Sequence, residues 1–250
     1  PANTLSLHNA LPISISLEEA LSNWEGPLES VFSTKINTTK VNSRNDKIYA
    51  SVENSKLKST PTIKIAKPRV IIPVFPGTNC EYDSMKAFER AGAEVEIIVI
   101  KNLSSRHIEE SIKAIAERIK SSQIVMLPGG FSAGDEPDGS GKFIATFFRN
   151  PVIRESINEL LKNRDGLMLG ICNGFQALIK LGLLPYGEIT DITQNSPTLT
   201  YNEIGRHISC TVQTKVVSTV SPWFSNLKVG DVHTIPVSRS EEHTSELQSQ

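Results

Sequence analysis

The sequence predicts an α/β fold: an open, mostly parallel β-sheet with helices on both faces, preceded by a linker. Two observations predict it. Between residues 70 and 181, apolar runs of strand length alternate with segments of helix length, as in parallel strands joined by helical crossovers. Residues 37–68 are instead polar, rich in Ser, Thr, Asn and Lys, and show no clear period. That composition is typical of a linker between domains.

The elements of the body follow one another in a regular order. The run 70–75 is apolar, and the run 95–100 is rich in β-branched residues. After the second run, Ile108, Ile112 and Ile115 lie on one face of a predicted helix. The expected strands are 70–75, 95–100, 123–127 and 167–171, and the expected helices are 81–91, 108–119, 142–148, 152–163 and 174–181.

The segments on either side of this body are less regular. An amphipathic pattern predicts one short helix within residues 14–36, which stops at Gly26 and the proline after it. Beyond Pro185 the pattern becomes irregular and more strand-like, through residues 208–217. Cys210 falls in that apolar stretch, so we expect its side chain in the core.

Composition and charge exclude several classes of protein. The 26 basic and 27 acidic residues give a net charge of -1, so neither a strongly basic nucleic-acid binder nor an acidic solvating tail is expected. No apolar stretch approaches the length of a membrane span. The 3 cysteines are too few and too odd in number for a disulfide scaffold, and their spacing predicts no metal site. We therefore expect a cytoplasmic protein, with Cys80 in a structural role.

Both ends of the chain look foreign to a natural protein. A back-translation of residues 239–249, RSEEHTSELQS, reproduces a sequencing-adapter sequence, and residues 4–13, TLSLHNALPI, resemble a frame of the opposite adapter. A signal peptide is the other reading of the N-terminus, but residues 1–13 carry no Lys or Arg. We expect residues 1–13 and 239–250 to be artefacts and the natural sequence to be cut at both ends.

The strongest chemical signal is the run GICNG at residues 170–174. An apolar strand leads into Gly-x-Cys-x-Gly and a helix follows at once, which is the pattern of a nucleophile elbow with cysteine as the nucleophile. The tight turn would raise the Cys172 sulfur above the carboxyl edge of the sheet. The positive end of the following helix would favour a thiolate there, and the Asn173 amide would face an oxyanion.

A second signal is the run LPGGFS at residues 127–132, which follows the third strand. Adjacent glycines let backbone amides approach a ligand closely. Because the loops after neighbouring parallel strands meet at one crevice, we expect this loop beside Cys172. A phosphate-binding loop is the alternative, but no Gly-Lys-Ser/Thr follows.

Together these runs resemble the class I glutamine amidotransferases, a flavodoxin-like family, and within them the glutaminase part of phosphoribosylformylglycinamidine synthases. On this resemblance, residues 68–238 are the amidotransferase domain and residues 14–67 are the linker and the end of a synthetase part. The runs that carry the resemblance are PGTNCE at 76–81, PGGFSAGD at 128–135, GICNGFQ at 170–176, SPW at 221–223 and VGDVHTIPVS at 229–238.

The resemblance implies a reaction and a site. Cys172 would attack the side-chain amide of glutamine, giving a glutamyl thioester and ammonia. The amides of Gly130 and Asn173 would hold the oxyanion, and Gln176 would contact the substrate. The residues implied in oxyanion and glutamine binding are Gly129, Gly130, Phe131, Asn173, Gln176, Asn202 and Arg206. No metal and no cofactor is implied in this domain; the partner is a synthetase domain that uses ATP and Mg²⁺ to convert formylglycinamide ribonucleotide to the amidine in purine synthesis.

The chain departs from the family in one respect. The family's base is a histidine, with a glutamate two residues on, after the segment that here ends at Ser238. His8 and His243 lie in the suspected foreign ends, and the other three histidines do not fit that position. We therefore expect a nucleophile without its base, and a chain that turns over little glutamine alone.

Two alternatives from other classes stay open. The first is a peptidase, deglycase or chaperone of related fold with an elbow cysteine, against which Gln176 and the run at 129–135 argue. The second is a non-catalytic interaction module. Glutaminase activity and complementation of a synthetase would separate the three hypotheses.

Overall fold

The computed structural model describes residues 15–25, 65–132, 141–191, 193, 196–197, 199–201, 207–239 and 241–243. The chain divides into two units, Pro1–Tyr49 and Ala50–Gln250. In the first unit the predicted short helix is present as α1, Leu17–Glu25. The Ser16 hydroxyl accepts a hydrogen bond from the Glu19 amide at 3.1 Å and so caps the first turn. The predicted stop at Gly26 lies outside the described residues.

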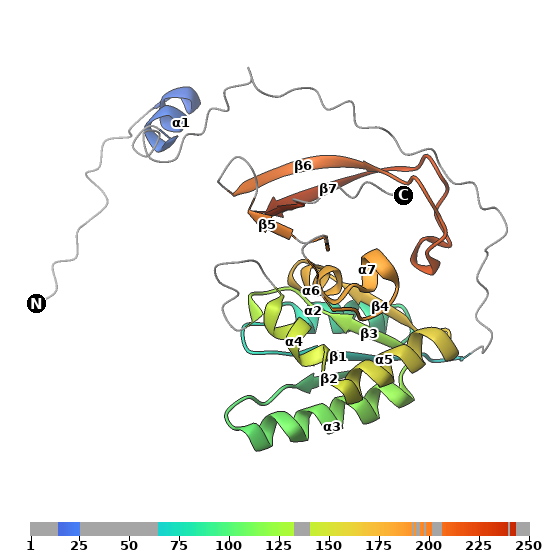
Figure 1. Cartoon of the computed structure of the whole chain (residues 1–250). Helices are drawn as coiled ribbons and strands as arrows, with labels where there is room; N and C mark the ends of the chain where they lie inside the picture. The colour runs from blue at the N-terminus through green and yellow to red at the C-terminus, as the bar shows by residue number, and fades with distance from the viewer. Residues whose placement is uncertain are drawn as a thin grey trace, which may run out of the picture. The chain divides into compact units, whose positions relative to one another are not determined.

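A four-stranded parallel sheet forms the centre of the second unit (Figure 1). Its strands are β1 (Arg69–Val74), β2 (Glu94–Val99), β3 (Ile124–Leu127) and β4 (Leu167–Gly170). Their order is β2-β1-β3-β4, and every neighbouring pair is parallel. The predicted strands are therefore confirmed to within a residue or two at each end, as is the parallel arrangement.

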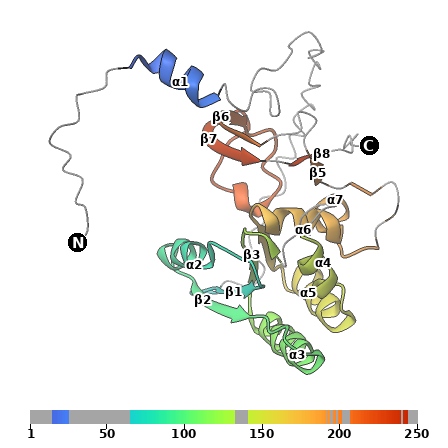
Figure 2. The ribbon, with the colours of Figure 1, turned by 90° about the vertical axis from the view of Figure 1, so that its left-hand side faces the viewer.

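Helices cover both faces of the sheet, as predicted (Figure 2). One face carries α2 (Glu81–Arg90), and the other carries most of the remaining helices. Those are α3 (Ser105–Ser121), α4 (Lys142–Phe148), α5 (Pro151–Asn163) and α6 (Asn173–Leu181), and a short α7 (Leu183–Tyr186) follows them.

The core has two parts because side chains along a strand point alternately to opposite faces. In β1, Ile71 belongs to the larger cluster, whereas Val70 and Ile72 belong to the smaller one under α2. Phe75, just past β1, anchors the larger cluster through edge-on contacts with the rings of Phe143 and Phe147 in α4. These centroids lie 5.7 and 5.3 Å from that of Phe75. The carboxyl end of β1 is thereby packed against α4.

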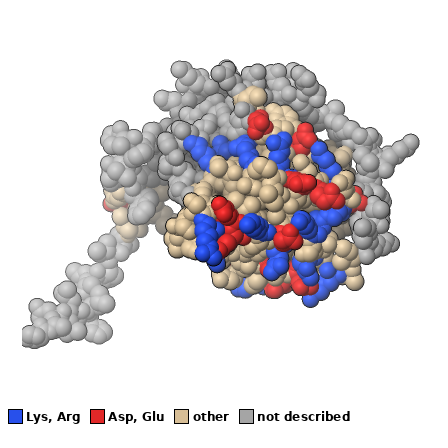
Figure 3. Space-filling view, turned by 60° about the horizontal axis from the view of Figure 1, so that its bottom comes forward, with Lys and Arg blue, Asp and Glu red and all other residues tan. Residues whose placement is uncertain are grey.

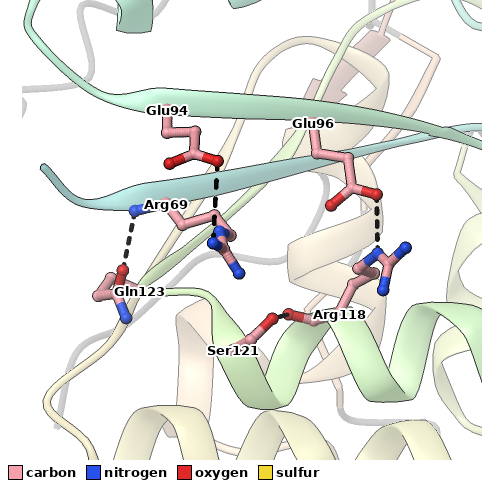
Figure 4. Close-up of polar contacts among 6 residues, drawn as sticks. All are labelled: Arg69, Glu94, Glu96, Arg118, Ser121 and Gln123. Atoms are coloured by element: carbon pink, nitrogen blue, oxygen red, sulfur yellow. Dashed lines mark hydrogen bonds and ion pairs between the residues drawn. The ribbon is translucent and has the colours of Figure 1, made fainter.

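Polar contacts tie together the opposite end of the sheet, where the strands begin (Figure 4). The Arg69 amide donates to the side-chain oxygen of Gln123 at 2.8 Å, and its guanidinium pairs with Glu94 at 3.8 Å. On the edge strand, Glu96 accepts from Arg118 of α3 at 2.7 Å. Charged side chains on an edge strand also discourage pairing with other chains.

Opposite charges interleave on the outer surface. On the face drawn in Figure 3, Lys and Arg side chains alternate with Asp and Glu, and no large patch has a single sign. Arg106 pairs with Glu110 within α3. Lys162 pairs with Glu188, and its hydrogen bond and charge hold the pKa of the Glu188 carboxyl below its usual range.

The residues after α7 form two small antiparallel pairs rather than a continuation of the central sheet. β5 (Leu199–Tyr201) pairs with β8 (Glu241–His243), and β6 (Ile208–Lys215) pairs with β7 (Val232–Arg239). A turn of 3-10 helix, Pro222–Phe224, lies between β6 and β7.

The prediction that Cys210 lies in the core is wrong. Its side chain is exposed, as is every other side chain of β6 except Val212, which is half-buried. The apolar run correctly indicated a strand. However, the strand joins a two-stranded hairpin, whose described side chains are all exposed or half-buried.

Candidate active site

Cys172 stands at the turn between β4 and α6, as the glycine spacing predicted. β4 ends at Gly170 and α6 begins at Asn173. The backbone of Cys172 has φ 52° and ψ -108°, a conformation that residues other than glycine rarely adopt. The turn is held by a hydrogen bond from the Gly174 amide to the Ile171 carbonyl at 2.9 Å. The Cys172 side chain is exposed.

The two glycines around Cys172 are required by close packing. A Cβ at Gly170 would lie 2.6 Å from the carbonyl oxygen of Gly174. A Cβ at Gly174 would overlap the carbonyl of Leu127, the last residue of β3. The first turn of α6 can therefore pack directly onto the ends of β3 and β4. This contact places the helix N-terminus, with its partial positive charge, at the cysteine.

The loop after β3 meets this turn, which confirms the predicted convergence of the two loops. Gly129 is so close that a Cβ built on it would lie 3.4 Å from the Cβ of Cys172. Gly130 has φ +118°, a conformation that requires glycine. The loop is thus placed to offer backbone amides next to the sulfur.

A third loop, after β1, holds the glycine loop in place. Thr78 and Gly130 form an isolated antiparallel bridge. In it the Asn79 amide donates to the Gly129 carbonyl at 2.9 Å, and the Phe131 amide donates to the Gly77 carbonyl at 2.8 Å. The Phe131 amide is therefore already used inside the protein, although its ring is 67% exposed. The Gly130 amide donates no hydrogen bond within the described part of the chain.

The side chains of Asn173 and Gln176 lie under the elbow. Asn173 is 1% exposed, and its side-chain oxygen accepts from the Ser132 amide at 3.4 Å. Its side-chain nitrogen donates to the Gln176 side-chain oxygen, also at 3.4 Å. Asn173 thus links the glycine loop to the first turn of α6. The direct contact between Gln176 and a substrate stays a prediction.

Not every predicted site residue falls within the described structure. Asn202 and Arg206 lie outside the described residues. Among the described side chains, no hydrogen bond links a histidine to the Cys172 sulfur. His107 is on α3 and His233 on β7, and the ring nitrogen of His207 lies 2.8 Å from the Ser238 hydroxyl in the hairpin. The sequence reasoning also missed Thr78. Its signal was the run PGTN at the end of a strand that neighbours the glycine-loop strand.

Cys80 is a second cysteine with a positive φ at the start of a helix. It precedes α2 and is exposed, with φ 67° and ψ 15°. These angles lie in the left-handed region that single residues in turns do visit, unlike those of Cys172.

Within the described ranges, no three His, Cys, Asp or Glu side chains gather where they could hold a metal ion. No helix of the described residues is long and apolar enough to cross a membrane.

Comparisons with known proteins agree on one family. Residues 67–249 match the model of the CobB/CobQ-like glutamine amidotransferase domain. The phosphoribosylformylglycinamidine synthase subunit PurQ of Dehalococcoides mccartyi is 40% identical over 142 residues, which are 57% of this chain and 50% of that protein. The PurQ subunit of Treponema denticola is 35% identical over 184 residues, or 70% of this chain and 63% of that protein. The chain thus spans between half and two thirds of the length of these relatives.

A solved structure is also similar. A chain in the structure of PurLQS from Thermotoga maritima superposes with a TM-score of 0.51 at 26% sequence identity. The superposition covers 71% of this chain and 69% of that chain. It supports the class I amidotransferase-like α/β fold described above.

Proposed function

Because the chain belongs to the CobB/CobQ-like glutamine amidotransferase domain family, we propose that it releases ammonia from glutamine as the glutaminase of a phosphoribosylformylglycinamidine synthase. The observation that carries the proposal is the strained turn at Cys172 beside the glycine loop. Strained backbone persists at functional sites because the surrounding structure holds it there. Its relatives named as PurQ subunits support the choice of synthase.

The geometry of the turn supports the following chemistry. The Cys172 sulfur, as a thiolate, attacks the side-chain carbonyl carbon of glutamine, and the carbonyl oxygen becomes an oxyanion. The amides of Gly130 and Asn173 stabilise that negative charge. The C–N bond then breaks, and the nitrogen leaves as ammonia after taking up a proton. Water hydrolyses the thioester to glutamate and frees the sulfur.

Removing the thiol proton and delivering it to the leaving nitrogen require a base. We propose that this base is the histidine and glutamate pair that the family resemblance implies after the position of Ser238; none of the 5 histidines of this chain fits that pair.

The remaining site residues would bind the substrate. Phe131 offers an exposed ring, rather than its amide, at the edge of the site. Gln176 is buried one helical turn after Cys172, and we propose that its side-chain amide contacts the substrate. We propose that Asn202 and Arg206 close the glutamine pocket, as the resemblance implies.

The ammonia needs an acceptor. The similar Thermotoga maritima structure is named for PurL, PurQ and PurS together, which supports a synthetase partner for this chain. We propose that the partner uses ATP and Mg²⁺ to convert formylglycinamide ribonucleotide to the amidine, and that this domain itself needs no cofactor. All three cysteines are free thiols, which supports a cytoplasmic location.

The test is labelling of the whole chain with a glutamine-mimicking chloroketone, followed by mass mapping of the cysteines. We expect Cys172 to be modified before Cys80 and Cys210, although all three are exposed. Excess glutamine should slow that modification. Cys172→Ala should abolish the protected label, and Cys210→Ala, the matched control in the hairpin, should not. Equal labelling of the three thiols, or no protection by glutamine, would contradict the proposal.

A further inference from the structure

The loop after β1 is closed by Thr78 in two ways. The Thr78 amide donates to the Phe75 carbonyl at 2.9 Å. Its hydroxyl accepts from the Phe75 amide at 3.0 Å. Between them Gly77 adopts φ +86°. The hydroxyl therefore holds a tight turn at the end of a buried strand, and replacing it would leave the Phe75 amide without its partner.

This turn fits closely against the glycine loop. Besides the two hydrogen bonds of the Thr78–Gly130 bridge, the Gly130 backbone packs on the turn itself. A Cβ at Gly130 would lie 2.7 Å from the Asn79 nitrogen and 2.9 Å from the Thr78 Cα. No side chain can enter between the two loops, so a shift of the turn is passed directly to Gly130.

The strand order sets the direction of the Gly130 amide. β3 lies between β1 and β4, so its loop has the Thr78 turn on one side and Cys172 on the other. The bridge toward Thr78 uses the Gly129 carbonyl and the Phe131 amide. In an antiparallel bridge, hydrogen-bonding groups of successive residues face opposite sides. The Gly130 amide is therefore left on the side of Cys172.

We propose that Thr78 is a positioning residue for the glutaminase reaction: its hydroxyl holds the turn that aims the Gly130 amide at the oxyanion. The proposal rests on the proposed function, because it needs Cys172 to attack a carbonyl. Thr78 itself need not touch the substrate. It acts through the bridge, on the same backbone amide that the reaction uses.

Two reactions of the same sulfur can test this. In the first, L-glutamic acid γ-(4-nitrophenyl) ester acylates Cys172: the S–C bond forms, the C–O bond breaks, and 4-nitrophenolate leaves without needing a proton. That reaction passes through an oxyanion. In the second, iodoacetamide alkylates Cys172 and iodide leaves, with no oxyanion formed. Both rates are measured on the whole chain, by nitrophenolate absorbance and by mass mapping of the Cys172 peptide.

Two variants separate the shape of the side chain from its hydroxyl. Thr78→Val keeps the branched shape but loses the hydroxyl that accepts from the Phe75 amide, whereas Thr78→Ser keeps that hydroxyl. We expect Thr78→Val to slow acylation about tenfold, less than the roughly 10²–10³-fold that loss of an oxyanion donor costs. Its rate with iodoacetamide should stay unchanged, and Thr78→Ser should keep both rates. Ser218→Ala removes a hydroxyl that accepts from the Val220 amide at 3.3 Å, far from the site in the sequence, and should also keep both rates.

Because an unfolded chain would also be alkylated at Cys172, the far-UV circular dichroism and urea midpoint of Thr78→Val must match those of the unsubstituted chain before the two rates are compared. An unchanged acylation rate in Thr78→Val would overturn the proposal, and so would an equal fall of both rates. If the unsubstituted chain reacts with iodoacetamide at Cys172 but not with the ester, the proposed function fails first.

Discussion

At the scale of single residues, backbone conformation distinguishes two cysteines that otherwise look alike. Cys80 and Cys172 are both exposed, both precede a helix, and both have positive φ. The backbone of Cys80 lies in the ordinary left-handed region. That of Cys172, with ψ -108°, lies outside the φ/ψ regions that are allowed for residues other than glycine. Such a conformation costs on the order of 1–3 kcal/mol. Packing of Gly174 on β3 holds the backbone there, and this strain supports the proposal that Cys172 is the nucleophile.

We predict that the glycines near Cys172 differ in what they tolerate. Gly174→Ala puts a Cβ into the Leu127 carbonyl, so it should lower the free energy of unfolding by about 1–3 kcal/mol. Gly129→Ala is the control, because its Cβ would make ordinary contacts of 3.4 and 3.7 Å. It should change stability by less than about 0.5 kcal/mol. Urea denaturation followed by circular dichroism measures both, and equal losses would contradict the packing argument.

At the scale of elements, one arginine joins three of them. Arg164 follows α5, and its guanidinium donates to the carbonyls of Ile119 at 2.7 Å, Lys120 at 2.6 Å and Ser122 at 3.1 Å. These carbonyls end α3 and lead into β3. The positive charge therefore meets the negative end of the α3 dipole, and the contact fixes α5 against α3.

We predict that Arg164→Ala lowers the free energy of unfolding by about 1.5–3 kcal/mol, because it removes charge-assisted hydrogen bonds. Arg164→Lys should restore only part of this, since one ammonium cannot reproduce the planar fork of donors. Arg106→Ala, which removes an exposed pair within α3, should cost only about 0.2–0.5 kcal/mol. Guanidinium denaturation compares the three variants. A loss at Arg164 no larger than at Arg106 would show that the cap contributes little.

At the scale of the whole molecule, Trp223 attaches the C-terminal segment to the open edge of β4. Its indole N–H donates to the Met168 carbonyl at 3.1 Å, and its ring packs edge-on against Phe88 of α2, with centroids 6.4 Å apart. The carbonyl would otherwise be an unpaired acceptor at a sheet edge. One side chain therefore covers the edge strand and extends the apolar face beneath α2.

We predict that Trp223→Ala releases this segment and leaves the sheet intact. Amide hydrogen exchange across residues 216–239 should become about tenfold faster, as expected for a loss of roughly 1.4 kcal/mol, while β1–β4 keep their protection. Trp223→Phe keeps the ring contact without the donor, so it should give an intermediate rate. Phe224→Ala, at an exposed neighbour, is the control and should change little. Faster exchange throughout β1–β4 would mean instead that Trp223 supports the global fold.

The sequence by itself determined the parallel sheet, its helices and the turn at Cys172, because apolar period and glycine spacing are local properties of the chain. Only the tertiary structure decided how the site is held. The Phe131 amide donates to Gly77, the Gly129 carbonyl accepts from Asn79, and Thr78 closes the turn beside both. Likewise, Cys210 is exposed because its strand joins a hairpin rather than the sheet. The physical reason is that a backbone hydrogen bond between distant loops depends on which strands are neighbours, and strand order is not written in any local pattern.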